Sequence, residues 1–245
     1  MHDRQDNQYW EALADDCEVR MGDDGNPFHR ELIRPATLRL LEPQPGERVL
    51  DAACGNGLFS LCLAKLGCEV RGFDFSPKMI AHAKRRCAGH AAQVKFSVAD
   101  ATDYDKMMAL GGGRPFDKAV ANMAVMDIED IRPLFRAVHA MLAPGGVFVF
   151  SAVHPCFQTP GRGFTEDGGL VTYHYIEPQK HAVRILANND KQAWHWHRPL
   201  QELLGTGFAA GFVLDGLEEP CAPGVSSNAV WEKLPLPIVI RMRKT

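Results

Sequence analysis

The chain has 245 residues, of which 23% are charged, and its formal net charge is −3. This length fits one α/β domain that buries a core large enough to need no disulfide or metal. The charge balance excludes the broad basic field that binding of nucleic acid or of an anionic membrane surface requires.

The seven cysteines are odd in number, and no two of them stand in a C-x-x-C spacing. Reduced thiols in a cytoplasmic protein are therefore expected, with no disulfide frame and no metal. The N-terminal residues lack the basic start and apolar stretch of a signal peptide, and no apolar run approaches the ~18 residues of a membrane span. A membrane partner is not expected.

Apolar runs alternate with helical periodicity from about residue 30 to 155, a pattern typical of a parallel sheet covered by helices. Strands are predicted at 48–50, 69–73, 94–98, 117–122 and 147–153, and helices at 58–66, 76–89 and 130–142. Ser76 is the expected N-cap of the second helix, and Gly89 its stop. In such sheets a ligand binds at the carboxyl ends of the strands.

Residues 154–197 break this rhythm with Pro, Gly and scattered aromatic residues, and the segment is too long for an ordinary connection. We predict a β-rich lid in which 170–176 pairs with 182–186. A helix near 199–204 and strands near 212–217 and 237–242 follow, and these two strands can pair antiparallel at an edge. The predicted organisation is a single domain with four parts: a helical cap (1–40), a cofactor-binding core (41–153), the lid (154–197) and a C-terminal helix with a strand pair (198–245).

The stretch "VLDAACGNGLF" places a carboxylate, Asp51, at the end of an apolar run and just before glycines 55 and 57. Glycines let a backbone approach a ligand closely, and the following helix offers unpaired N–H groups. The stretch therefore predicts a ligand cradle. A dinucleotide fingerprint needs a third glycine, where this chain has Ser60, so the dinucleotide pattern fits poorly.

Two further acids end predicted strands, Asp74 in "GFDFSPKMI" and Asp100 in "VAD". With the motif "DAACGNG", they resemble the class I S-adenosylmethionine-dependent methyltransferases, in particular those that act on small molecules (methyltransferase type 11-like). Ala53 stands where the commonest form of the motif has a glycine. The resemblance implies a Rossmann-like α/β fold with a seven-stranded, mostly parallel sheet whose last strand is antiparallel.

The resemblance also implies S-adenosylmethionine (SAM) as cofactor and S-adenosylhomocysteine (SAH) as its product. Asp74 would accept both ribose hydroxyls, Asp100 would bind the adenine amino group, Phe75 and Met79 would flank adenine, and Asn122 would lie near the methionine moiety. The full set of cofactor-binding residues that it implies is Asp51, Ala53, Gly55, Asn56, Gly57, Asp74, Phe75, Met79, Asp100, Ala101 and Asn122.

The expected activity is methyl transfer to an oxygen, a nitrogen or a carbon of a small-molecule acceptor, by a monomer or a homodimer. Two alternatives stay open: a nicotinamide-dependent reductase on the same sheet, and a cofactor-binding module without catalysis. The missing third glycine and the extra acid, Asp100, argue against the reductase.

Methyl transfer from a sulfonium needs alignment, desolvation and in some cases a base. Asp127 and His154 follow the fourth and fifth predicted strands and are the candidate bases, with a helix cap and a loop hydrogen bond as the alternatives. Tyr9, Trp10, His154 and Trp194 are candidate acceptor contacts. In "WHWH" (194–197), His195 and His197 could join a metal site, but lining of the acceptor pocket or packing under the lid is the favoured interpretation.

Overall fold

The computed structural model describes residues 8–183, 192–221 and 232–245. Seven strands form one sheet in the order β10-β11-β5-β4-β1-β2-β3. The strands are β1 (Arg48–Ala52), β2 (Glu69–Asp74), β3 (Val94–Val98), β4 (Phe116–Ala121), β5 (Leu142–Val153), β10 (Phe212–Glu218) and β11 (Pro237–Lys244). Strand β11 runs antiparallel to both of its neighbours, β10 and β5, and the other pairs in this sheet are parallel. The predicted fold class is confirmed.

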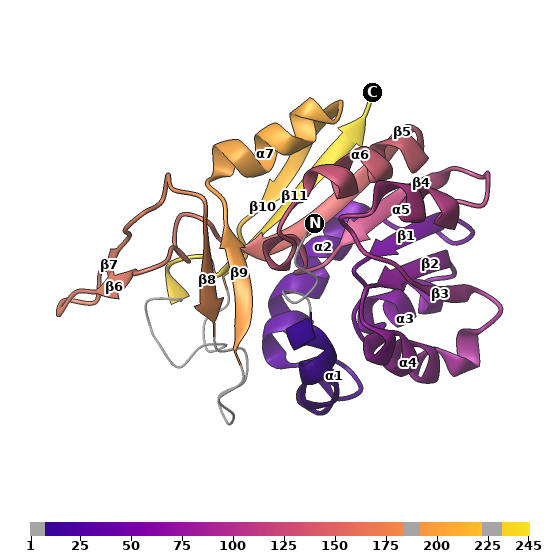
Figure 1. The fold of residues 1–245 in the computed structure, drawn as a ribbon, viewed down its shortest axis with the longest axis horizontal. Helices are drawn as coiled ribbons and strands as arrows, with labels where there is room; N and C mark the ends of the chain where they lie inside the picture. The colour runs from indigo at the N-terminus through magenta and orange to yellow at the C-terminus, as the bar shows by residue number, and fades with distance from the viewer. Residues whose placement is uncertain (1–7, 184–191, 222–231) are drawn as a thin grey trace.

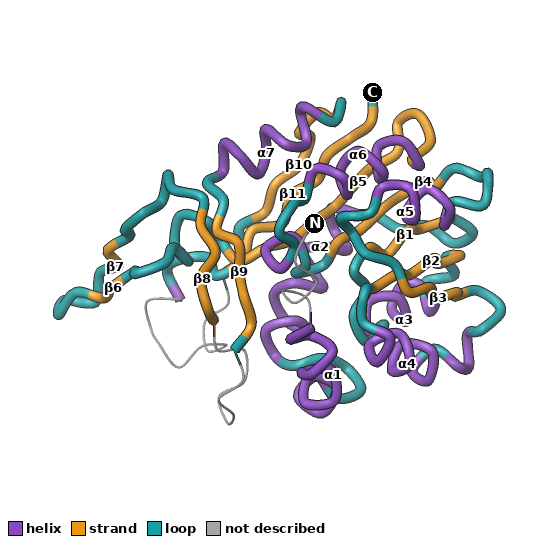
Figure 2. The backbone as a smooth tube through the Cα atoms, in the orientation of Figure 1, coloured by secondary structure: helices purple, strands orange, loops and turns teal. Residues whose placement is uncertain are grey.

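Helices cover both faces of the sheet (Figure 1). On one face lie α2 (Arg34–Leu41), α3 (Leu58–Lys65) and α4 (Pro77–Arg86), and on the other lie α5 (Tyr104–Leu110), α6 (Arg132–Met141) and α7 (Leu200–Ala209). Short helical turns, η1 (Phe28–Ile33), η2 (Ala88–His90) and η3 (Val125–Asp127), connect longer elements (Figure 2). Consecutive strand residues point to opposite faces, so Val49 joins one core cluster and Leu50 the other.

Local sequence explains where the elements begin. The Ser76 side chain caps α4 by accepting a hydrogen bond from the Met79 N–H at 3.1 Å, as predicted. Helix α5 was not predicted, because its seven residues carry too little periodic signal. Strand β5 begins at Leu142, five residues earlier than predicted, because the segment containing Pro144 and Gly145 pairs loosely with β4 before the regular register begins.

The lid differs from the prediction in its pairing. Strand β6 (Gly163–Phe164) pairs with β7 (Leu170–Val171), and β8 (Gln179–Val183) pairs with β9 (Ala193–His197). The expected ribbon of 170–176 with 182–186 is therefore wrong, and its residues 184–186 lie outside the described residues. A tight turn explains the change. The Thr165 hydroxyl accepts a hydrogen bond from the Gly169 N–H at 2.7 Å, and this turn pairs β7 with β6, its neighbour in the chain.

Helix α1 (Gln8–Met21) lies between the lid strands and the helices α3 and α4 (Figure 1). It packs against α4, and the Tyr9 hydroxyl donates a hydrogen bond to the Trp194 carbonyl of β9 at 3.1 Å. Helix α2 instead packs directly on β5 and β11 of the sheet.

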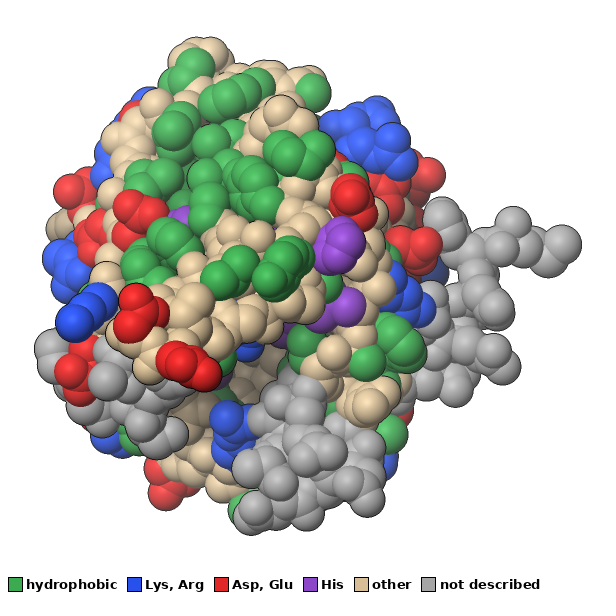
Figure 3. Space-filling model, turned by 90° about the vertical axis from the view of Figure 1, so that its left-hand side faces the viewer, with side chains coloured by type: hydrophobic (Ala, Val, Ile, Leu, Met, Phe, Trp, Pro, Cys, Tyr) green, Lys and Arg blue, Asp and Glu red, His purple; other side chains and the backbone are tan. Residues whose placement is uncertain are grey.

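Strand β10 is an edge strand, and together with α7 it exposes four large hydrophobic side chains: Phe208, Val213, Leu214 and Leu217. In Figure 3 hydrophobic side chains gather in the upper part of the face, the end at which Figure 1 places α7 and β10. Within the described ranges, no helix is both long and apolar enough to span a membrane.

Candidate active site

A cavity of about 720 Å³ opens at the carboxyl ends of β1, β2 and β4, where α1, η1 and β9 complete its walls. Parallel strands bring their carboxyl ends to one edge, so residues far apart in the chain meet there. The cavity wall includes ten of the predicted cofactor-binding residues: Asp51, Ala53, Gly55, Asn56, Asp74, Phe75, Met79, Asp100, Ala101 and Asn122.

The loop between β1 and α3 turns through three left-handed residues. Ala53, Gly55 and Gly57 have φ angles of 51°, 52° and 76°. An alanine in this region carries a steric cost that glycine does not, so the departure at Ala53 places a strained residue at the cavity wall. Gly57 does not line the cavity but lies against α4, where an added Cβ would be 2.8 Å from the Cβ of Ala83.

The two glycines give a matched pair of variants. Gly57→Ala is expected to lower the free energy of unfolding by roughly 2–4 kcal/mol, through left-handed strain and overpacking. At Gly55 an added Cβ meets no atom within 4 Å and would project into open space. Gly55→Ala should therefore cost only about 1–2 kcal/mol but weaken SAH binding more. Chemical denaturation and calorimetric titration measure the two effects, and equal stability losses in both variants would contradict this account.

Asp51, at the end of β1, is 1% exposed and accepts a hydrogen bond from the Ser60 hydroxyl of α3. Burial raises its pKa to about 7, and the nearby charge of Asp74 adds to the shift. A carboxylate held in such a place is expensive without a ligand. The site therefore favours a ligand that brings a hydrogen-bond donor or a positive charge.

Asp74, at the end of β2, links the loop between β1 and α3 to the start of α4. Its two carboxylate oxygens accept hydrogen bonds from the N–H groups of Gly55 and Ser76, each at 2.9 Å. Burial raises its pKa to about 6, which these two hydrogen bonds oppose. Each oxygen keeps a further lone pair for a donor in the cavity.

Two more predicted residues hold their neighbours in place. Asp100 accepts hydrogen bonds from the N–H and the hydroxyl of Thr102, both at 2.8 Å. The side-chain oxygen of Asn122 accepts from the Ser151 hydroxyl at 2.8 Å and from Thr37 at 3.3 Å. These bonds fix the side chains at the cavity wall before any ligand arrives.

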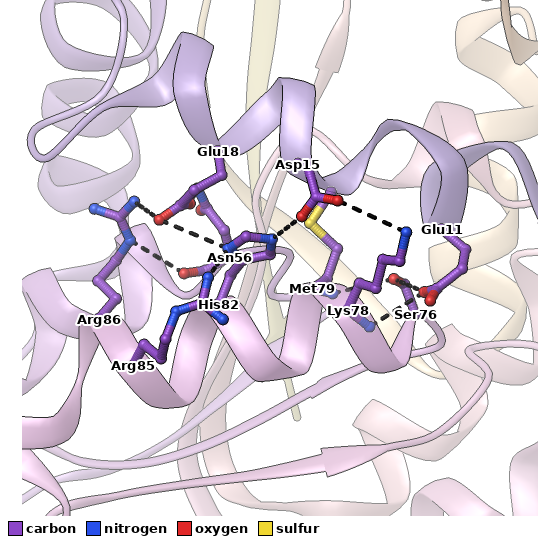
Figure 4. Close-up of polar contacts among 10 residues, drawn as sticks. All are labelled: Glu11, Asp15, Glu18, Asn56, Ser76, Lys78, Met79, His82, Arg85 and Arg86. Atoms are coloured by element: carbon purple, nitrogen blue, oxygen red, sulfur yellow. Dashed lines mark hydrogen bonds and ion pairs between the residues drawn. The ribbon is translucent and has the colours of Figure 1, made fainter.

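Helix α1 is held beside α4 and the glycine loop by three acids on one of its faces: Glu11, Asp15 and Glu18 (Figure 4). Glu18 accepts a hydrogen bond from the Asn56 amide at 2.6 Å, and so reaches the glycine loop itself. Glu11 accepts from the Ser76 hydroxyl, two residues after Asp74. The helix is therefore tied to both segments that the ligand would contact, and Trp10 contributes to the cavity wall.

Of the two candidate bases, only Asp127 lies at the cavity. His154 is 2% exposed and has both ring nitrogens engaged, with Nε2 2.7 Å from Glu219 and Nδ1 3.2 Å from the Cys156 N–H. Burial lowers its pKa. The structure thus places His154 in the loop hydrogen bonds that were its alternative interpretation, and this geometry does not favour a base. The chain turns directly after β5, where the N–H groups of Phe157 and Gln158 bond the His154 carbonyl and the His154 N–H bonds the Leu236 carbonyl.

His195 takes the place that sequence reasoning assigned to His154. It is the middle residue of β9, and its Nε2 lies 3.3 Å from Oδ1 of Asp127. Of the predicted acceptor contacts, Trp10 lines the cavity, whereas Tyr9 and Trp194 bond to each other behind it. Within the described ranges, no three metal-ligating side chains cluster as a metal would need. The repeated Trp-His pattern was a signal for the lining, but nothing in the sequence paired His195 with Asp127.

Residues 49–146 match a family model described as a methyltransferase domain. The chain is 31% identical over 195 residues to a demethylmenaquinone methyltransferase of Clavibacter sepedonicus, covering 75% of this chain and 72% of that protein. It is 30% identical over 151 residues to a ubiquinone biosynthesis O-methyltransferase of Xanthomonas campestris, of which it spans 57%, with 60% of this chain aligned.

Among solved structures, a SAM-dependent methyltransferase from Mesorhizobium loti superposes with a TM-score of 0.72 at 28% identity, over 91% of this chain and all of that one. The fold, the glycine loop and the acids at the strand ends agree with this match. The chain belongs to the class I SAM-dependent methyltransferases.

Proposed function

We propose that the enzyme transfers a methyl group from SAM to an oxygen or nitrogen of a small acceptor with a largely apolar body. The observation that carries this is a buried carboxyl and imidazole, Asp127 and His195, on a cavity wall that also contains Met126, Ile128 and Val183. The named relatives are a demethylmenaquinone methyltransferase and a ubiquinone biosynthesis O-methyltransferase, which supports a quinone-like acceptor, and the second name supports transfer to oxygen.

The residues present fit SAM. The two-oxygen acceptor at Asp74 suits the ribose hydroxyls, Asp100 suits the adenine amino group, and the open space at Gly55 leaves room for close approach of the backbone. Phe75 and Met79 supply apolar contact for the adenine ring. When bound, SAM supplies a methyl group that its sulfonium has already activated, so the chain needs chiefly to orient the acceptor and to exclude water.

Family membership decides against the two alternatives, a nicotinamide-dependent reductase and a module without catalysis. Which atom of the acceptor receives the methyl group is a separate question. The relative from Clavibacter is named for demethylmenaquinone and that from Xanthomonas for O-methylation. We prefer an O–H acceptor, because a carbon acceptor presents no polar hydrogen to the Asp127 and His195 pair.

A matched acceptor panel tests the proposal. Catechols and hydroquinones, their amino analogues and their fully methylated ethers are incubated with labelled SAM, and SAH formation is measured. Turnover is expected with free O–H or N–H compounds and not with the ethers. If the enzyme binds SAH but methylates only a protein or a nucleic acid, the small-molecule assignment is wrong.

A further inference from the structure

Asp127 and His195 belong to segments far apart in the chain that meet across the cavity. Asp127 ends η3, the turn after β4, and His195 lies in the lid strand β9. Their side chains are 12% and 13% exposed, and both line the cavity. Nε2 of His195 lies 3.3 Å from Oδ1 of Asp127, so the contact joins the lid strand to the turn after β4.

The pair has unused hydrogen-bonding capacity. Oδ1 of Asp127 is buried and has no hydrogen-bond partner among the described residues, although His195 is near. His181, directly opposite His195 in the β8–β9 register, likewise keeps a buried Nδ1 unpartnered within the described chain. Buried polar atoms without partners are costly, so an unpartnered acceptor facing a ligand cavity points to a donor on the ligand.

The empty cavity favours an uncharged pair. Burial raises the pKa of Asp127 well above its usual value, and the charge of Asp74 across the cavity raises it further. Burial lowers the pKa of His195 to about 4, with help from His181. Without a ligand, burial therefore favours the carboxylic acid at Asp127 and the neutral imidazole at His195.

Other charged groups near the pair lie on the loop that carries Asp127 and on the lid side. Glu129 and Asp130 follow on the same loop, and the Asp130 pKa is lowered by its hydrogen bond to Arg132. On the lid side, Arg162 acts on His181 and lowers its pKa together with burial. A positive charge in the cavity would favour the ionised form of Asp127, whose buried Oδ1 has no hydrogen-bond partner in the described chain, and also that of Asp51 at the same cavity.

Arg198 ties the two segments together. It follows β9 directly, is 8% exposed, and donates to the carbonyls of Val125 at 3.1 Å and Ile128 at 2.6 Å, on either side of Asp127. It also donates to the Glu129 carbonyl. One guanidinium therefore sets the position of the Asp127 loop relative to the strand that carries His195.

We propose that Asp127 and His195 form one proton site that a cation in the cavity converts from carboxylic acid to carboxylate, and that Arg198 is its positioning residue. The proposal rests on the proposed function, because the sulfonium of SAM is the cation. The pair is thus a base only in the loaded enzyme. Because the carboxyl ionises only when the cation binds, the empty enzyme does not hold an unpaired buried charge.

The proton balance of the reaction follows. Binding of the cation expels the carboxyl proton to solvent. The acceptor oxygen then forms its new bond to carbon while the sulfur–carbon bond breaks with its electron pair on sulfur. The O–H proton passes to the ionised pair, and His195 shares it through the 3.3 Å contact. The pair ends uncharged beside a neutral thioether, which restores its initial state.

Proton release on binding tests the proposal without any acceptor. SAM and SAH are titrated calorimetrically into the full-length enzyme near pH 7 in phosphate and in Tris, whose ionisation enthalpies differ. SAM should release up to one proton more than SAH, because only SAM carries the sulfonium charge. Protons released by ribose contacts to Asp74 are common to both ligands and cancel in the difference.

Variants assign the difference to the pair. Asp127→Asn should remove most of it while SAH affinity stays within a few-fold, leaving the part that Asp51, another buried acid with a raised pKa at the cavity, contributes. Asp130→Asn, which removes a neighbouring acid, should leave the difference unchanged. Arg198→Met should reduce it to less than half, and Arg198→Lys should restore part of it. If the methionine variant does not fold, the lysine variant alone tests the role of Arg198. Its difference in proton release between SAM and SAH should then lie between zero and that of the wild type.

The outcomes distinguish a failure of the proposed function from a failure of the proton site. If neither SAM nor SAH binds, the proposed function fails. Equal proton release for SAM and SAH in the wild type, or a difference that Asp127→Asn does not reduce, would overturn the proton site while leaving the methyltransferase assignment intact. A wild-type difference in both Arg198 variants would overturn the positioning role alone.

Discussion

Asp74→Asn is expected to weaken SAH binding by about 10²-fold, the largest loss we expect from one side chain in the cavity. Hydrogen bonds to a charged acceptor are worth about 1.5–3 kcal/mol each, and 1.4 kcal/mol is a factor of ten. Two such bonds to ribose hydroxyls therefore account for the loss even after solvent competes. Asparagine keeps the size of the side chain and one oxygen for the N–H of Gly55 or Ser76. Calorimetric titration measures the affinity.

Asp74→Ala separates binding from folding. Alanine leaves the N–H groups of both Gly55 and Ser76 without the carboxylate they bond at 2.9 Å, so it should lower the melting temperature as well as the affinity. The asparagine variant should lose mainly affinity. Wild-type affinity in a folded asparagine variant would show that Asp74 has only a structural role.

The pH dependence of binding gives an independent check on Asp74. Its pKa of about 6 is that of the empty site, and hydroxyl donors bind its ionised form. The SAH affinity contributed by Asp74 should therefore be full above about pH 7 and fall as the pH drops through about 6. Asp74→Asn should remove this part of the acid limb.

Asp51→Asn is expected to stabilise the empty enzyme at pH 8 by about 1–3 kcal/mol while weakening SAH binding. The sign follows from the pKa, which burial raises from 3.8 to about 7 in the folded chain. A raised acid contributes stability that is full below about pH 4 and lost as the pH rises through about 7. At pH 8 the wild type buries an ionised carboxylate, and asparagine removes that cost.

Denaturation at pH 5 and pH 8 tests this sign. The gain from Asp51→Asn should shrink toward pH 5, where the wild-type side chain is protonated. Ser60→Ala is the matched control: it removes the hydroxyl donor to Asp51 and should destabilise the enzyme most at pH 8, where the carboxylate is ionised. A variant of Asp51 that loses equal stability at both pH values would contradict the electrostatic account.

The effects at Asp51 and Asp127 share one physical origin. Both carboxyls are buried against a cavity, and burial raises the pKa of each. At pH 8 Asp51 is ionised in the empty protein, so its neutral variant should gain stability where it loses function. In our proposal Asp127 keeps its proton until the ligand binds, so its neutral variant should change the stability of the empty enzyme little.

The sequence by itself determined the parallel core and the sheet edge at which the cavity opens. Apolar strands, a capped α4 helix and acids at the strand ends are local patterns, and the carboxyl ends of parallel strands must meet at one edge. For this reason the positions of Asp51, Asp74 and Asp100 at the cavity followed from residue order alone. The antiparallel pairing of β10 with β11 also followed, because the two apolar runs are the last in the chain.

Tertiary structure decided the strand pairing within the lid and the partner of Asp127. Short strands in a polar segment carry a weak periodic signal, so the Thr165 turn chose the pairing of β6 with β7. His154 follows a core strand, as a cavity residue would, yet the turn after β5 buries it against Glu219. His195 lies beside Asp127 where β9 packs on η3, and Arg198 bonds the two segments together through the Val125 and Ile128 carbonyls. These residues are about 70 apart in the chain, and no local pattern encodes their contact.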